Sequence, residues 1–218
     1  MKYIIVGAVA GGASTAARIR RLDEHAEIII FEKGEYISFA NCGLPYYIGD
    51  VIKDRNKLFV QTAAAFNQRF NIDVRVQTEV TAINPSAKTI TAVKLLTGEV
   101  YEEPYDKLIL SPGAEPVRPP LPGIGIEGIF TLRNVRDTDY IKAYVQQKQV
   151  TRAVIIGAGF IGLEMAENFY ELGLDVTVVE MINQVMAPVD YPIASFVQQH
   201  IRSKRVHLRL NTAVTGFT

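Results

Sequence analysis

A pattern of strand, glycine turn, helix, strand and acidic residue occurs twice in this chain. The first copy runs from Tyr3 to Glu32 and the second from Val154 to Glu180. Glu32 follows Gly7 by 25 residues, and Glu180 follows Gly157 by 23. A repeat with an offset of about 150 residues is too long for a solenoid. It predicts two βαβ units and therefore two dinucleotide sites.

The glycine turns give the repeat its expected chemistry. A tight turn brings the backbone close to a pyrophosphate, and the next helix begins with free N–H groups and the positive end of its dipole. The second turn, Gly157 to Gly162, is a complete G-x-G-x-x-G motif in this context. The first turn, Gly7 to Gly12, has Val9 in place of the middle glycine. The alternative for the second turn is a glycine-rich connection without a ligand.

The acid at the end of each second strand predicts which nucleotide binds. A carboxylate there accepts hydrogen bonds from a ribose diol and repels a 2′-phosphate. No arginine or lysine follows Glu180 in the stretch from Met181 to Gln184, which favours NADH over NADPH. A simpler role for Glu180, ending a strand at the surface, leaves its match to Glu32 without explanation.

These patterns predict an α/β protein with two Rossmann-like dinucleotide-binding units, the second of them incomplete. We expect an FAD-type domain over 1–115 with an inserted β-hairpin, a connection over 116–150 and a truncated NAD-type domain over 151–218. Between and after the repeats we expect helices at Thr62–Phe70, Asp137–Gln147 and Tyr191–Ser203, and strands at Asp73–Val80, Lys88–Leu95, Glu99–Leu110 and Val206–Leu210.

Charge and composition exclude several classes of partner. The 23 basic and 23 acidic residues leave no net field to attract nucleic acid or an anionic membrane. The segment from Met1 to Ala17 has some features of a signal peptide, but its glycines and Tyr3–Val6 favour a buried strand and a turn. No other segment has the length of a membrane span. We therefore expect a cytoplasmic protein.

The chain contains one cysteine, Cys42. It can form no intrachain disulfide and no cysteine-built metal site, and we predict no metal. Pro45 suits the first turn of a helix, so Cys42 is expected near a helix N-terminus that favours thiolate. The alternative is a small buried apolar side chain.

Four motifs together resemble the coenzyme A-disulfide reductase family. They are the turn Gly7–Gly12, the stretch Ser38–Gly49 around the cysteine, Leu110–Ala114 and Leu132–Asn134. Asn168 and the stretch Gln184–Pro188 are further similar to NADH-dependent persulfide reductases that are often fused to a rhodanese domain. The resemblance covers essentially the whole chain.

The resemblance implies roles for individual residues. FAD contacts are implied for Gly7, Ala10, Gly11, Gly12, Glu32, Lys33, Asn41, Val80, Ser111, Pro112, Gly113 and Arg133. NAD contacts are implied for Gly157, Gly159, Phe160, Ile161, Gly162 and Glu180, with Phe160 as an aromatic gate. Contacts with coenzyme A are implied for Ser14, Arg18, Arg21, Ser38 and Asn41. For Arg18 and Arg21 the alternative is a solvated helix face.

The implied enzyme passes electrons from NADH through FAD to Cys42 and reduces coenzyme A disulfide, a coenzyme A persulfide or a polysulfide. Ala10 stands where NADH peroxidases have a histidine, which disfavours peroxide reduction. Family chains continue into further segments and form homodimers, so we expect this chain to be an N-terminal part. The alternatives are an NADH oxidase that reduces oxygen, and an inactive nucleotide-binding fragment.

Overall fold

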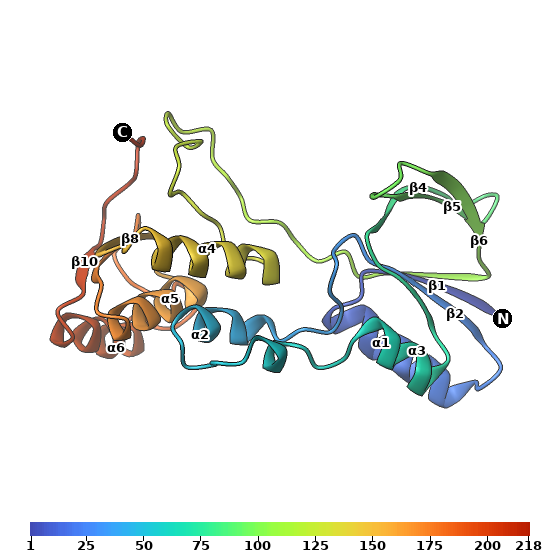
Figure 1. Cartoon of the computed structure of the whole chain (residues 1–218). Coiled ribbons are helices and arrows are strands. Elements are labelled where there is room, and N and C mark those ends of the chain that lie inside the picture. The colour runs from blue at the N-terminus through green and yellow to red at the C-terminus, as the bar shows by residue number, and fades with distance from the viewer. The chain divides into compact units, whose positions relative to one another are not determined.

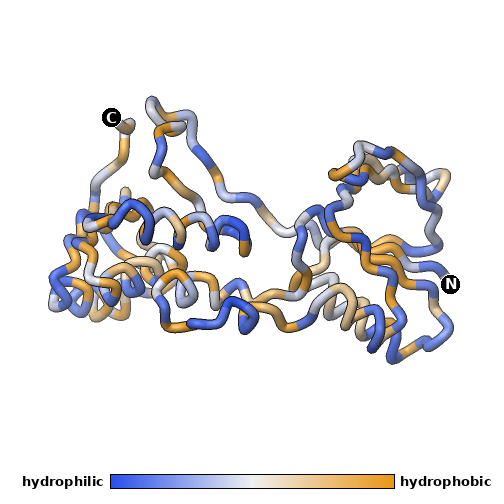
Figure 2. The backbone as a smooth tube through the Cα atoms, in the orientation of Figure 1, coloured by the Kyte–Doolittle hydropathy of each residue, from blue (hydrophilic) through white to orange (hydrophobic).

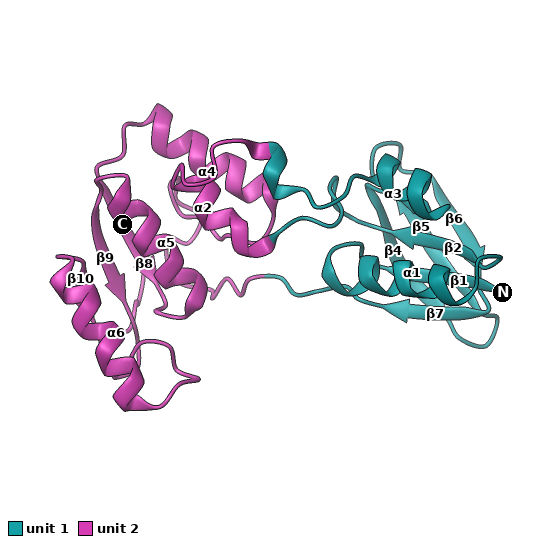
Figure 3. Cartoon of the chain, turned by 90° about the horizontal axis from the view of Figure 1, so that it is seen from below, with its two compact units in different colours: residues 1–40, 56–115 teal, residues 41–55, 116–218 magenta.

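The computed structural model describes residues 1–218, which form two compact units (Figures 1 and 3). The first unit comprises residues 1–40 and 56–115, and the second comprises 41–55 and 116–218. The elements of the first unit are β1 (Lys2–Val6), α1 (Ala10–Leu22), β2 (Glu27–Phe31), α3 (Ala63–Phe70), β3 (Asp73–Arg75), β4 (Thr78–Asn84), β5 (Thr89–Lys94), β6 (Val100–Pro104) and β7 (Lys107–Leu110). Those of the second are η1 (Asn41–Gly43), α2 (Leu44–Ile48), α4 (Val135–Gln147), β8 (Arg152–Ile156), α5 (Phe160–Glu171), β9 (Asp175–Val179), α6 (Tyr191–Ser203) and β10 (His207–Arg209), and the short η2 (Arg55–Leu58) spans the boundary between the units.

The first unit is built on a parallel sheet with the strand order β3-β2-β1-β7. After their charged first residues, Lys2 and Glu27, its central strands are apolar (Figure 2) because both faces of the sheet are covered. Ile28 and Ile30 pack with α1 and with Phe66 of α3 on one face. Ile29 and Phe31 pack with β5 of the antiparallel sheet β4-β5-β6 on the other. The expected α/β fold is confirmed.

Two of the expected strands are each divided into two. The segment Asp73–Val80 contains β3 and the start of β4, which belong to different sheets. Gln77 between them has a left-handed backbone with φ of 50°, and this ends the extended run. The segment Glu99–Leu110 contains β6 and β7, and the chain changes sheet at Tyr105 and Asp106. Alternation of apolar residues does not reveal such a change of sheet.

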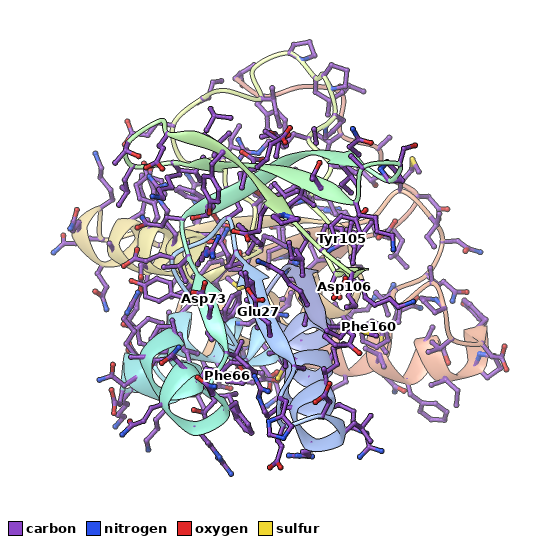
Figure 4. All side chains as sticks on the ribbon, turned by 90° about the vertical axis from the view of Figure 1, so that its right-hand side faces the viewer. Glu27, Phe66, Asp73, Tyr105, Asp106 and Phe160 are labelled. Carbon is purple, nitrogen blue, oxygen red and sulfur yellow. The ribbon has the colours of Figure 1, made fainter.

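An ion-pair network joins the sheets of the first unit, and its acids Glu27 and Asp73 are labelled in Figure 4. Lys2 Nζ lies 2.6 Å from Glu103 and 2.9 Å from Glu27. Arg75 pairs with the same Glu103 and with Asp73. Burial alone would raise the pKa of Glu103, but hydrogen bonds from Lys2 and Arg75 outweigh it and lower the pKa.

The second unit has the parallel sheet β10-β9-β8. Its core contains Val176 and Val178 of β9 with Met165, Ala166 and Phe169 of α5. Helix α4 begins at Val135 with a capping box, in which Asn134 and Asp137 each accept a backbone N–H of the other.

Residues 41–55 belong to the second unit by packing, whereas the domain division predicted from the sequence groups them with the first. Helix α2 contacts α4 and α5, and Ile48 is part of the same core as Val176. A five-residue helix is unstable alone, so it joins whichever core buries its apolar face.

None of the helices combines the length and the hydrophobicity that a membrane span requires. No cluster of three or more histidine, cysteine or acidic side chains is arranged to hold a metal ion.

Candidate functional site

The first glycine turn joins β1 to α1 in a conformation that depends on glycine. Gly7 has φ of 95°, and its N–H donates to Phe31 O at 2.8 Å. A Cβ at Gly12 would lie 1.7 Å from Gly7 O, so only glycine permits this packing of the helix on the turn. Helix α1 has no side-chain cap at Val9, and its first N–H groups remain available to an anion.

Glu32 connects this turn to the end of β2. Its Oε2 accepts the N–H of Ala8 at 2.7 Å, and its Oε1 accepts that of Gly34 at 2.7 Å. The carboxylate is therefore held at the rim of the turn, where each oxygen keeps a further lone pair for a ribose hydroxyl. The next residue, Lys33, pairs with Glu79 of β4 at 3.0 Å.

The second glycine turn repeats these contacts. Gly157 has φ of 97°, and its N–H donates to Val179 O at 2.8 Å. Glu180 accepts the N–H of Ala158 at 2.8 Å and that of Ile182 at 3.1 Å. A Cβ at Gly162 would lie 2.0 Å from Gly157 O. Glu32 and Glu180, which matched in sequence, therefore each hold the glycine turn of their own unit by accepting the same pair of backbone N–H groups.

The structural repeat extends further than the sequence repeat. Ser38 and Met186 both have left-handed backbones, with φ of 45° and 50°. The Ser38 N–H donates to Ala8 O at 2.9 Å, and the Met186 N–H donates to Ala158 O at 2.8 Å. The expected repeat ended at the acids because these side chains have nothing in common. Only the backbone reveals their equivalence.

The second turn has room for a dinucleotide. Apart from its two chain neighbours, no heavy atom lies within 4 Å of the position that a Cβ would take at Gly159. The neighbouring Phe160 and Ile161 are 55% and 57% exposed. The open space beside an uncapped helix start fits a pyrophosphate.

The residues after β7, to which the resemblance assigned flavin contacts, lie beside the first turn. Ser111 N–H donates to Val6 O at 2.8 Å. A Cβ at Gly11 would lie 3.0 Å from Ser111 Oγ, and one at Gly7 would lie 3.5 Å from Pro112 N. Val80, by contrast, is half-buried on β4 and packs against the core formed around Phe31.

A surface pocket of about 350 Å³ lies beside α1. It brings together Ser14, Arg21 and Ser38, three of the residues that the sequence assigned to coenzyme A. The pocket also contains Arg69 and Gln61, which the sequence reasoning missed. The helix Thr62–Phe70 was expected, but nothing in its sequence shows that it packs near α1. Its apolar lining includes Ala10 and three phenylalanines, Phe39, Phe66 and Phe70.

The remaining predicted residues lie outside this pocket. Arg18 is exposed on α1 and is not among the residues that line it. Asn41 and Arg133 belong to the second unit. The N–H of Arg133 donates to Asp137 Oδ2 at 2.9 Å, next to the capping box of α4.

Cys42 is an exposed free thiol in the short helix η1. Helix α2 follows directly, with Pro45 in its first turn as the sequence suggested. The expected alternative of a buried apolar cysteine does not apply, since Leu44 and Ile48 of α2 supply the buried contacts while the thiol is open to solvent.

The family model for pyridine nucleotide-disulphide oxidoreductases matches residues 1–218. The chain belongs to this family. The solved structure of reduced Bacillus anthracis CoADR-RHD is 56% identical, with a TM-score of 0.97 over 99% of this chain and 39% of that one. A structure described as an NAD-dependent persulfide reductase from A. fulgidus is 37% identical, with a TM-score of 0.95 over 100% of this chain and 41% of that one.

Among curated proteins, the coenzyme A disulfide reductase of Staphylococcus haemolyticus (strain JCSC1435) is 44% identical over 215 residues. The match covers 99% of this chain and 48% of that protein. The chain thus spans about half the length of the curated relatives that it matches. The resemblance predicted from four motifs is confirmed at the level of the family.

Proposed function

We propose that the protein is an FAD-dependent, NADH-using reductase of coenzyme A disulfide or of a persulfide. The observation that carries the reaction class is the duplicated site, in which Glu32 and Glu180 are each tied to their own glycine turn by the same pair of hydrogen bonds. Two dinucleotide sites in one chain suit a transfer of electrons between two dinucleotides.

The first turn is the proposed FAD site. Gly7, Ala10, Gly11 and Gly12 would hold its pyrophosphate and Glu32 its adenosine ribose, and further contacts would come from Lys33, Asn41, Val80, Ser111–Gly113 and Arg133. The second turn holds NADH through Gly157, Gly159, Ile161 and Gly162, with Phe160 over the nicotinamide side. When bound, FAD supplies a carrier of two electrons between nicotinamide and sulfur. Glu180 and the absence of a basic residue up to Gln184 support NADH rather than NADPH.

Cys42 is the proposed redox sulfur. Its thiolate attacks one sulfur of the disulfide, so that a mixed disulfide forms and one thiol leaves with a proton. Two electrons and a proton from NADH then cleave the mixed disulfide, which restores the Cys42 thiolate and releases the second thiol. A persulfide substrate reacts in the same way, with hydrogen sulfide as one of the products.

The pocket beside α1 supports coenzyme A as the thiol carrier. Arg21 and Arg69 suit its phosphates, while Phe66 and Phe70 offer apolar surface to the rest of the molecule. Ser14, Ser38, Asn41 and Arg18 remain proposed contacts. Domain limits of 1–115, 116–150 and 151–218 and a homodimeric cytoplasmic enzyme also follow from the family resemblance as proposals.

The test is the oxidation of NADH by the full-length flavoprotein with coenzyme A disulfide, with coenzyme A persulfide and with oxygen alone. We expect turnover with a sulfur substrate, its loss in Cys42→Ser, and no change in Ser86→Ala, which alters an exposed loop residue. Full turnover in Cys42→Ser would refute the role of the cysteine. Consumption with oxygen alone identifies an NADH oxidase, and a flavin-free, inactive preparation identifies a nucleotide-binding fragment.

A further inference from the structure

The segment that carries Cys42 is short and has little structure of its own. Cys42 lies in η1, and α2 follows with five residues, ends at Ile48 and has Gly49 as its C-cap. A helix of this length is not stable by itself in water. The position of the thiol therefore depends on what α2 contacts within the second unit.

On one side α2 meets α5 through Gly49 and Asn168. Asn168 is 1% exposed, and its Nδ2 donates to Glu164 O at 2.8 Å, which fixes the side chain on its own helix. A Cβ at Gly49 would lie 2.1 Å from Asn168 Oδ1 and 2.7 Å from Asn168 Cβ. The contact therefore requires glycine on α2 and locates the end of α2 closely against α5.

On the other side α2 meets α4 through Lys142. Its Nζ donates to Tyr47 O at 2.6 Å and pairs with Asp50 at 2.5 Å. The same ammonium lies 4.4 Å from the centroid of the Tyr47 ring. The Lys142 side chain is only 13% exposed and its contact with Tyr47 O is partly buried, whereas the Asp50 side chain is 50% exposed. A cation at the last carbonyls of a helix satisfies groups that have no partner within the helix.

One helical turn before Lys142, Asp139 forms a bidentate pair with Arg55 at 2.7 to 3.0 Å. Arg55 is the last residue of the segment 41–55, so this pair holds the part of the segment that follows α2 against α4. Lys142 and Asp139 of α4 thus hold Tyr47, Asp50 and Arg55, and Asn168 of α5 packs closely against Gly49. Ile48 is the one residue of the segment 41–55 that belongs to the hydrophobic core of the second unit around Val176.

We propose that Lys142 and Asn168 are positioning residues for Cys42, acting through α2 rather than on the sulfur. The role rests on the proposed function of Cys42 as redox sulfur. Lys142 holds the C-terminal end of α2 on α4, and Asn168 sets its distance from α5. Together they keep the loop before α2, and with it the thiol, in one orientation.

The test follows Cys42, the one cysteine among the 218 residues of this chain. The rate of alkylation by iodoacetamide, a neutral reagent, is measured between pH 6 and 10 and compared with that of the urea-unfolded chain. Because the contacts of α2 hold the loop with Cys42 in one orientation, we expect the alkylation rates of the native chain across this range to differ from those of the unfolded chain. Lys142→Met and Asn168→Ala should shift the native profile toward the unfolded profile, with a change in rate of at least threefold, and Lys142→Arg should restore most of the native profile.

Lys148→Met is the matched control, because Lys148 lies at the end of the same helix and pairs only with the exposed Glu127. Hydrogen exchange of residues 44–52 gives a second measure and should become at least tenfold faster in Lys142→Met. A native profile equal to the unfolded one, or unchanged profiles in both Lys142→Met and Asn168→Ala, overturns the proposal. Alkylation requires no turnover, so this result is independent of the Cys42→Ser activity test.

Discussion

Gly159 and Gly162 belong to the same motif, yet the structure predicts opposite consequences for their replacement by alanine. A Cβ at Gly162 would lie 2.0 Å from Gly157 O and 3.3 Å from Ile155 Cγ2. A Cβ at Gly159 would meet nothing within 4 Å. Gly162→Ala should therefore damage the fold, whereas Gly159→Ala should leave the fold intact and obstruct the nucleotide.

The magnitudes follow from these contacts. Alanine at Gly162 gains about 1 kcal/mol of helix propensity. The atom that it would strike is a backbone oxygen, which cannot rotate aside as a side chain can, so the overpacking cost lies in the upper part of the usual range, at about 2–3 kcal/mol, and the net loss is about 1–2 kcal/mol. At Gly159, with φ of −77° and ψ of −175°, alanine is allowed. Alanine lowers the conformational entropy of the unfolded chain, which stabilises the folded state by about 0.4–1 kcal/mol. Alanine is also a poorer helix N-cap than glycine, and this loss offsets the gain, so the free energy of unfolding stays nearly unchanged.

Thermal unfolding and NADH titration separate the two effects. Gly162→Ala should lower Tm by about 2–8 °C, taking about 2–4 °C for each kcal/mol at this chain length. Gly159→Ala should keep the wild-type Tm and weaken NADH binding at least tenfold, or about 1.4 kcal/mol, in a titration followed by NADH fluorescence. Wild-type NADH affinity in Gly159→Ala, or a wild-type Tm in Gly162→Ala, would refute the reasoning.

Three further outcomes are expected. Arg69→Ala should weaken coenzyme A binding about tenfold through the loss of a charge-assisted phosphate contact, while Arg202→Ala, on the exposed side of α6, should not; equal affinities in calorimetry would contradict the pocket assignment. The pKa of Glu103 is lower in the folded protein than its ordinary value of 4.5. Its ionised carboxylate therefore stabilises the fold at pH values above 4.5, and this stabilisation is lost as the pH falls through the folded pKa. The Tm difference between wild type and Glu103→Gln should therefore be largest near pH 7 and shrink toward pH 3, and a constant difference would count against it. Asn134→Ala should cost about 1 kcal/mol by removing the α4 cap, seen as a lower Tm for the second unit, and an unchanged Tm would argue that the cap is not needed.

Much of the first unit could be predicted because its strands are buried on both faces. The run of isoleucines in β2 is typical of a strand that is covered on both faces, as in a parallel sheet. The hairpin strands were harder to place, because a change of sheet at Gln77 or Asp106 alters backbone direction without altering the alternation of side chains. The pocket residue Arg69 was missed for a related reason, since its proximity to α1 depends on two helices packing on one sheet.

The sequence by itself determined the two βαβ units, their glycine turns and the acids at the ends of their second strands. These features are local, since each depends on the backbone freedom of glycine or on the burial of a few consecutive residues. Tertiary structure decided which unit carries Cys42, how far the structural repeat extends, and which arginines share a pocket. Such contacts join segments far apart in the chain, and their free energy comes from burial and hydrogen bonds that no local pattern records.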